Sequence, residues 1–197
     1  MTLARKARGN QGGFLMLEVL IALFILLIGL IGLAGLQARA QATENESYQR
    51  VQALMLLRDM VDRINANRTN APSYVTGTST PLGYGNTLAV DCGAPLNTVE
   101  TDQCQWNAAL IGAAESSGGI CNSGTGANCV GAMIRARGCV ENIGGGAVTG
   151  PFLVTVAWQG LVSSAAPPSS VQCGKDLYGD DTFRRAVTTV VQIANLS

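Results

Sequence analysis

The longest apolar run of this chain lies near its N-terminus and contains a single charged residue. From Phe14 to Leu36 every residue is apolar or glycine except Glu18. A helix rises about 1.5 Å per residue, so this run would be roughly 34 Å long, enough to cross a hydrocarbon core of about 30 Å. The pattern therefore predicts a membrane-spanning helix. A carboxylate in such a helix costs about 2.5 to 3.5 kcal/mol near the centre and less toward the ends, so Glu18 needs a compensating interaction.

After Leu36 the pattern becomes amphipathic without a break, and it predicts that the same helix continues from about residue 15 to about residue 67. Five apolar residues at helical spacing are expected to form its buried stripe: Val51, Leu54, Leu57, Val61 and Ile64. Four charged residues are expected to be mostly solvated: Arg50, Asp59, Asp62 and Arg63. Asp59 and Arg63 have the spacing of a helical ion pair. The helix should end between Asn65 and Asn70, before Pro72.

The rest of the chain predicts a small sheet. Three segments have strand character, residues 132–140, 152–159 and 185–193, and the second alternates most clearly. One predicted face of this strand consists of Phe152, Val154, Val156 and Trp158, and the other of Leu153, Thr155, Ala157 and Gln159. Residues 103–116 predict a short helix with Trp106, Leu110 and Ile111 as its buried edge, whereas residues 70–101 have the composition of turns. A long helix on an antiparallel sheet of three to four strands is an α+β fold.

Composition limits the molecule to one modest domain beyond the apolar run. The chain has 197 residues and a formal net charge of zero, with 13 basic and 13 acidic side chains. No clustered basic face is evident, so we expect no nucleic-acid partner. The charge is uneven only at the start, where three basic residues precede Gly13: Arg5, Lys6 and Arg8. This leader predicts that residues 1–13 stay in the cytoplasm and that the rest of the chain is outside.

All six cysteines follow the apolar run, and their even number predicts disulfide bonds formed in an oxidising compartment such as a bacterial periplasm. They are Cys92, Cys104, Cys121, Cys129, Cys139 and Cys173. The count allows fifteen pairings, and the sequence does not choose among them. A glycine-rich loop at residues 118–131 is expected to be stapled by Cys121 and Cys129. A zinc site is disfavoured because the chain has no histidine and no CxxC pair. We expect no cofactor and no metal.

The junction around Gly13 resembles that of the type IV pilins and pseudopilins. In this family a basic leader ends in glycine, an aromatic residue follows, and a glutamate stands fifth in an apolar helix, as in Gly13-Phe14-Leu15-Met16-Leu17-Glu18. The resemblance implies that a prepilin peptidase cuts between Gly13 and Phe14 and methylates the new amine of Phe14. Glu18 of one subunit would then neutralise the amine of a neighbour, a buried pair that sets register in the filament.

The resemblance divides the chain into four parts. Residues 1–13 would be the cleaved cytoplasmic leader, 14–36 the transmembrane and filament-core helix, 37–70 its amphipathic half, and 71–197 a globular periplasmic head. The head looks most like the minor pilins of the PilV type. That likeness rests on Gln105-Trp106, the strand segment 154–159, the last cysteine, and Arg184-Arg185 at the start of the last strand.

A likeness to the PilV type implies a structural protein at low copy number in a type IV pilus. It would prime assembly as part of a tip complex and support pilus biogenesis, twitching motility and cell adhesion. Its implied partners are the prepilin peptidase, other minor pilins and the major pilin, the inner-membrane assembly platform, membrane lipid before assembly, and a large tip adhesin. It would move from the bacterial inner membrane, as a single-pass protein, to the extracellular pilus. The alternative is a minor pseudopilin of a type II secretion system.

We expect no enzymatic activity, because the chain has no histidine to act as a general base and no catalytic constellation is evident. Asp180 and Asp181 are expected to form a polar turn before the last strand, with a calcium site there or near Asp91 as the alternative. Four arginines are interpreted as charges that block the edges of the sheet. They are Arg135, Arg137, Arg184 and Arg185.

Overall fold

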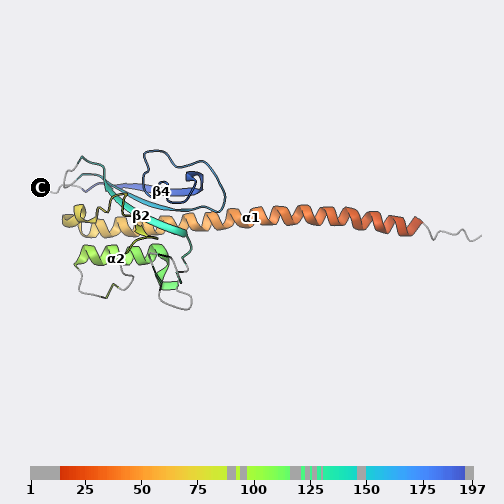
Figure 1. The fold of residues 1–197 in the computed structure, drawn as a ribbon, viewed down its shortest axis with the longest axis horizontal. Helices are drawn as coiled ribbons and strands as arrows, with labels where there is room; N and C mark the ends of the chain where they lie inside the picture. The colour runs from red at the N-terminus through yellow and green to blue at the C-terminus, as the bar shows by residue number, and fades with distance from the viewer. Residues whose placement is uncertain are drawn as a thin grey trace, which may run out of the picture. The chain divides into compact units, whose positions relative to one another are not determined.

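The computed structural model describes residues 14–87, 92–93, 97–115, 121–122, 125, 128–129, 131–145 and 150–193. The chain forms two compact units, Met1–Glu44 and Asn45–Ser197. Helix α1, Phe14–Ala66, contributes residues to both units (Figure 1). This helix begins and ends within one residue of the predicted limits. We call the second unit the head and describe each unit by itself.

In the first unit, the described side chains of the apolar run are all exposed. The large apolar side chains between Met16 and Leu36 are 51% to 78% exposed. By length and composition, α1 is the one helix in the described part of the chain that could cross a membrane. An apolar surface of this extent needs lipid or other helices around it, because leaving it in water forgoes about 25 cal/mol per Å².

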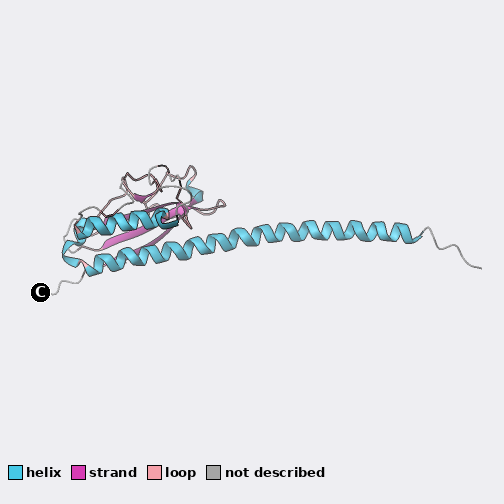
Figure 2. Ribbon diagram, turned by 90° about the horizontal axis from the view of Figure 1, so that it is seen from below, coloured by secondary structure: helices cyan, strands magenta, loops and turns pink. Residues whose placement is uncertain are grey.

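The head places two helices beside a four-stranded sheet. A 3₁₀ helix, η1 (Arg68–Tyr74), follows α1 and is followed by strand β1 (Leu82–Gly83) and helix α2 (Thr98–Ile111). A short 3₁₀ helix, η2 (Ala113–Glu115), then leads toward β2 (Ile134–Asn142) and β3 (Phe152–Gln159). The last turn, η3 (Asp181–Phe183), opens into β4 (Arg184–Val191). The strands are antiparallel in the order β1-β2-β3-β4, and α2 runs alongside the head part of α1 (Figure 2).

The observed sheet confirms the predicted α+β fold, and one of the two predicted faces of β3 lies in the main core. Phe152, Val154, Val156 and Trp158 are all at most 3% exposed and belong to the main core. Strands β2, β3 and β4 lie within two residues of the predicted segments. Strand β1 was not predicted, because a two-residue strand has no periodicity to detect.

The predicted buried stripe of α1 is only partly right. Leu57 and Ile64 are buried, but Val51 is 48% exposed and Leu54 is 38% exposed. The stripe that faces the core consists of Ala53, Leu57, Met60 and Ile64. This second set also has helical spacing, and the segment contains so many apolar residues that periodicity alone does not choose between the two stripes.

Helix α2 begins five residues earlier than predicted and ends at Ile111 instead of residue 116, so residues 70–101 are not all turns. The start is set by a capping box: the Asn97 side chain accepts a hydrogen bond from the Glu100 backbone N–H, and the Glu100 side chain accepts one from the Asn97 backbone N–H. The end is set by Gly112, whose φ of 69° is left-handed. The predicted buried edge of Trp106, Leu110 and Ile111 is confirmed.

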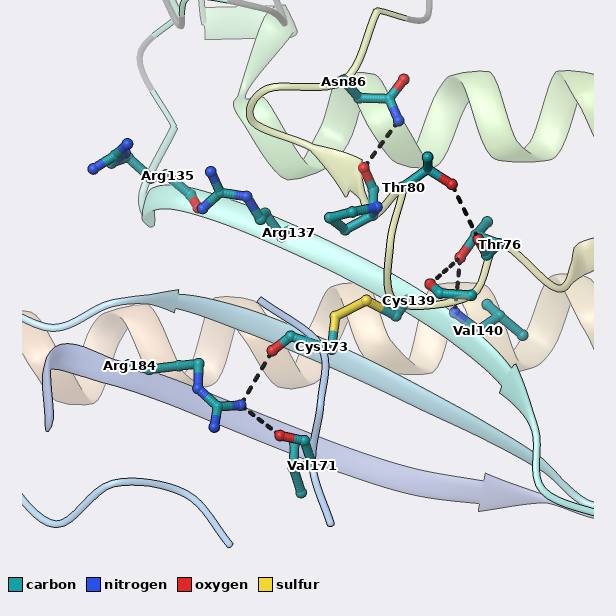
Figure 3. Close-up of a disulfide and its surroundings, with 12 residues drawn as sticks. Thr76, Thr80, Asn86, Arg135, Arg137, Cys139, Val140, Val171, Cys173 and Arg184 are labelled. Carbon is teal, nitrogen blue, oxygen red and sulfur yellow. Dashed lines mark hydrogen bonds between the residues drawn. A yellow bond between two sulfur atoms is a disulfide. The ribbon is translucent and has the colours of Figure 1, made fainter. Parts of the chain in front are cut away.

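Both faces of the sheet are covered. The chain between β3 and η3, residues 160–180, is called the outer segment. It covers the face of the sheet that is turned away from the main core, and the Cys139–Cys173 disulfide bonds it to β2 (Figure 3). The two cysteines pack with Ala157, Tyr178 and the half-buried Ala186 in a second, smaller core. A residue of β3 that points away from the helices is therefore as deeply buried as its neighbours, which explains why Ala157 is fully buried.

A polar network joins α1, η1 and α2. Arg63 forms the predicted ion pair with Asp59, at 3.1 Å, and also donates to Asp102 at 2.8 Å and to Gln105 at 2.7 Å. The Tyr74 hydroxyl donates to the second carboxylate oxygen of Asp102. Arg63 is thus half-buried between helices and not mostly solvated, because α2 lies over it.

This network predicts a loss of stability in alkaline solution. Burial, together with the hydrogen bond to Asp102, raises the pKa of Tyr74 from its ordinary value of 10.0 to about 12. The folded state holds the neutral phenol, so this contribution is complete below pH 10 and is lost as pH rises toward 12. We expect the stability difference between wild type and Tyr74→Phe to shrink over that interval, measured by denaturant unfolding at each pH. A difference that stayed constant up to pH 12 would contradict the assigned role of the phenol.

Candidate assembly and interaction sites

The residues predicted to govern processing and assembly lie at the start of the first unit. Gly13 lies outside the described residues, and Phe14 is the first residue of α1. Glu18 lies four residues after Phe14, about one helical turn along α1, and its side chain is exposed among exposed apolar neighbours. No ion pair to Glu18 is formed by the described residues of its own chain.

All six predicted cysteines form disulfides, and the structure selects one of the fifteen pairings. The bonds are Cys92–Cys104, Cys121–Cys129 and Cys139–Cys173. The first fixes the segment before α2 to that helix, the second closes the glycine-rich loop as expected, and the third binds the outer segment to β2. A disulfide stabilises mainly by restricting the unfolded chain, and the effect grows with the loop that it closes. The third bond, with a separation of 34 residues, closes the longest loop.

The turn before β4 uses its carboxylates within the protein. Asp180 accepts a hydrogen bond from the Thr182 backbone N–H at 2.9 Å. Asp181 receives two bonds from Arg184, at 2.6 and 2.8 Å, which hold the pKa of that carboxyl below its ordinary value. Both acidic side chains therefore have polar partners in a turn before a strand, as predicted. Asp91 lies outside the described residues, and the described part of the chain contains no group of three or more potential metal ligands.

The interpretation of four arginines as edge-blocking charges is wrong for two of them. Arg184 opens the edge strand β4 but is only 1% exposed. The Nη1 atom of its guanidinium donates to the carbonyl oxygens of Val171 and Cys173, at 2.7 and 3.2 Å. Arg184 therefore anchors the outer segment (Figure 3). Arg137 lies on β2, inside the sheet, and is 6% exposed. The sequence pattern does not reveal this because Arg184 is covered by a loop that folds back over it, and Arg137 is covered by Tyr84 and Tyr178, which are more than 40 residues away in the chain.

Arg185 ties the edge strand to α1. Its guanidinium donates to Glu46 at 3.2 Å and to the Val162 carbonyl oxygen at 2.6 Å. Glu46 also accepts a hydrogen bond from the Val162 backbone N–H, at 3.4 Å. These contacts hold the loop after β3 against the beginning of the head part of α1.

Two tyrosines that the sequence analysis did not select stack on the arginines of β2. Tyr84 has Arg135 at 4.8 Å and Arg137 at 5.2 Å from its ring centroid. Arg137 also lies 4.9 Å from the centroid of the Tyr178 ring. These are cation–π distances. Neither tyrosine stands in a motif, so no local signal in the sequence could have identified them.

The comparison with family models supports one family. The model described as "Tt1218-like: Type IV pilin Tt1218" matches residues 35–109, from the apolar part of α1 through most of α2. The matched segment is 75 of the 197 residues, and the match supports the type IV pilin superfamily. Comparisons with curated proteins and with solved structures gave no match. The matched segment does not include Gly13, Phe14 or Glu18, so the likeness at the N-terminal junction is separate support for the same family.

The pilin assignment agrees with the architecture. A long apolar helix continues into a head in which it packs on an antiparallel sheet, and three disulfides hold the head loops. Pilins are in general structural proteins that contact other pilus components. The predicted absence of enzymatic activity is consistent with that general role and stays a prediction for this pilin.

Proposed function

We propose that this pilin is a minor subunit of a type IV pilus, processed at Gly13 and assembled into the filament through its N-terminal helix. The observation that carries the proposal is an exposed apolar helix with one exposed carboxylate, Glu18, continuous with a disulfide-bonded head. Such a helix is suited first to the lipid bilayer and then to a bundle of similar helices. The head is suited to an oxidising space outside the cytoplasm.

The charge balance of the helix gives Glu18 its role. Cutting between Gly13 and Phe14 creates an amine on Phe14, and the apolar run contains no other anion than Glu18. In a bundle of apolar helices, each charge would be expensive alone, and pairing Glu18 of one subunit with the amine of another neutralises both. The pair forms only when the two helices have the matching axial offset in the bundle. It would therefore fix the axial position of an incoming subunit.

The place of this subunit follows from its resemblance to the PilV type. It would prime filament assembly in a tip complex with other minor pilins, contact the major pilin and the assembly platform, and carry a large adhesin. Pilus biogenesis, twitching motility and adhesion would depend on it. Before assembly it would lie in the inner membrane with its head in the periplasm.

Mass spectrometry of the mature protein tests this proposal. Pili are sheared from cells that express the full chain, and the N-terminal peptide is analysed in the sheared fraction and in the membrane fraction. We expect a peptide that begins at Phe14 and carries the added mass of one methyl group in both fractions. An intact leader would overturn the processing at Gly13. A cut and methylated protein that is absent from sheared pili would reject the pilus and favour the type II secretion pseudopilin.

A further inference from the structure

The two arginines of β2 that stack on tyrosines, Arg135 and Arg137, carry positive charge without a carboxylate partner among the described residues. Three other arginines of the head that are at least half-buried have carboxylate partners: Arg63, Arg184 and Arg185. Among the described residues, Arg135 and Arg137 have no such ion pair. Arg137 donates weakly to the Arg135 carbonyl oxygen, at 3.4 Å, and is otherwise held by the rings of Tyr84 and Tyr178. Arg137 is buried within this stack, whereas Arg135 is exposed, so Arg135 is the member of the pair that can reach a negative charge from outside the head.

A β-bulge aims Arg135 at the surface. Ile134 pairs with Gln159 and Arg137 pairs with Ala157, so β2 contains one more residue than β3 between these two pairs. Arg135 has a φ of 52°, a left-handed conformation that is unfavourable for a residue other than glycine. The shift admits Met133 to the core in place of Ile134, which is 40% exposed. Bulges and strained residues of this kind often re-aim a side chain at an interaction site.

Beside the bulge lies a pocket of about 250 Å³. Its walls include Ile111, Met133, Ile134 and Ala136, and Arg135 and Tyr84 line it as well. The walls are therefore mainly apolar, and Arg135 adds a cation. Figure 3 shows Arg135 and Arg137 on the same stretch of β2, with the Arg135 guanidinium directed away from the Cys139–Cys173 disulfide.

We propose that this pocket binds a carboxylate carried by a small apolar group, with Arg135 as the residue that holds the carboxylate. A guanidinium presents a planar fork of donors that matches the two oxygens of a carboxylate. Tyr84 holds that fork by stacking on it, which reduces the loss of side-chain freedom on binding. The apolar walls take the aliphatic part. Two sources have this chemistry: a chain terminus that ends in an apolar residue, and a free aliphatic acid.

The site is independent of the processing and assembly proposed above. All its residues belong to the head, and none lies near Phe14 or Glu18 in the sequence. A result on the pocket therefore leaves the role of the N-terminal helix open, and a failure of Glu18 to act in assembly leaves the pocket open.

The test measures binding to the full chain in detergent micelles by NMR or calorimetry. N-acetyl-leucine represents an apolar chain terminus, hexanoate represents a free acid, and N-acetyl-leucinamide is the matched uncharged probe. We expect saturable binding of at least one acid, with the amide roughly tenfold or more weaker, because a hydrogen bond to a charged group contributes about 1.5 to 3 kcal/mol. Preference for N-acetyl-leucine would identify a chain terminus, and preference for hexanoate would identify a free acid.

Two variants locate the binding. Arg135→Asn removes the guanidinium while keeping a residue that tolerates a positive φ, and it should weaken acid binding roughly tenfold or more. Arg58→Gln removes another exposed arginine on α1 and should leave binding unchanged. Unfolding curves confirm that each variant is folded. The proposal is overturned if neither acid binds saturably, if the amide binds as well as the acids, or if folded Arg135→Asn binds like wild type.

Discussion

Replacing Glu18 by alanine is expected to leave this pilin in the membrane and to remove most of it from the pilus. The substitution deletes a carboxylate whose presence in an apolar helix costs free energy, so insertion should be as good as in wild type or better. In the filament, the same change leaves the amine of a neighbouring Phe14 without its anion in an apolar bundle. Breaking a buried charge pair from one side costs about 3 to 5 kcal/mol, which corresponds to a loss of incorporation of roughly a hundredfold or more.

The measurement compares the amount of pilin in membranes and in sheared pili for each variant. Glu44→Ala is the matched control, because it removes the same side chain from an exposed position of α1 outside the apolar run. We expect Glu44→Ala to assemble normally. Wild-type levels of Glu18→Ala in sheared pili would refute the charge pair, whereas loss of both variants from the membrane would point to a fault in insertion instead.

Gly138→Ala is expected to destabilise the head strongly. Gly138 lies on β2 opposite Val156, and α2 crosses over it. A Cβ atom at this position would overlap two ring atoms of Trp106 and would lie 2.8 Å from Leu110 Cδ1. Trp106 has no room to retreat, because it is fully buried and its indole N–H donates to the Leu56 carbonyl oxygen at 2.9 Å. Overpacking of this kind costs about 1 to 3 kcal/mol, and we expect about 3 kcal/mol here.

A smaller ring provides the control for this clash. Trp106→Phe alone should destabilise the head because it leaves a cavity and loses the bond to Leu56. Combined with Gly138→Ala, it should cost clearly less than the sum of the two single changes, since the new methyl group enters the space that the indole leaves. Denaturant unfolding followed by the fluorescence of Trp158, which every variant retains, gives the free energies of unfolding. Additive costs would show that the two positions do not share one packing site.

Local patterns in the sequence predicted α1 and the strands β2, β3 and β4 to within two residues. The run from Phe14 to Leu36 predicts a helix because every position is apolar over the required length. The alternation in β3 predicts which of its residues share a face because side chains of a strand alternate between two sides. The N-terminal junction points to the pilin superfamily because glycine, aromatic residue and glutamate stand in one register. All three signals depend only on neighbours in the chain.

Helix α2 shows where such signals are less accurate. Its start depends on a single capping box at Asn97 and Glu100, both of which lie in a segment rich in turn residues. The predicted helix starts at residue 103, five residues too late. A cap satisfies backbone groups whatever the hydrophobic pattern, so periodicity does not reveal it.

The sequence by itself determined that this protein has an apolar helix with one carboxylate, an α+β fold, and six cysteines that all follow the apolar run. The tertiary structure decided which stripe of α1 is buried, which cysteines pair, and that Arg184 lies inside the head. It also brought Tyr84 and Tyr178 onto the arginines of β2. The physical reason is that these outcomes depend on which segments the fold brings into contact, and the local pattern of apolar and polar residues does not contain that information.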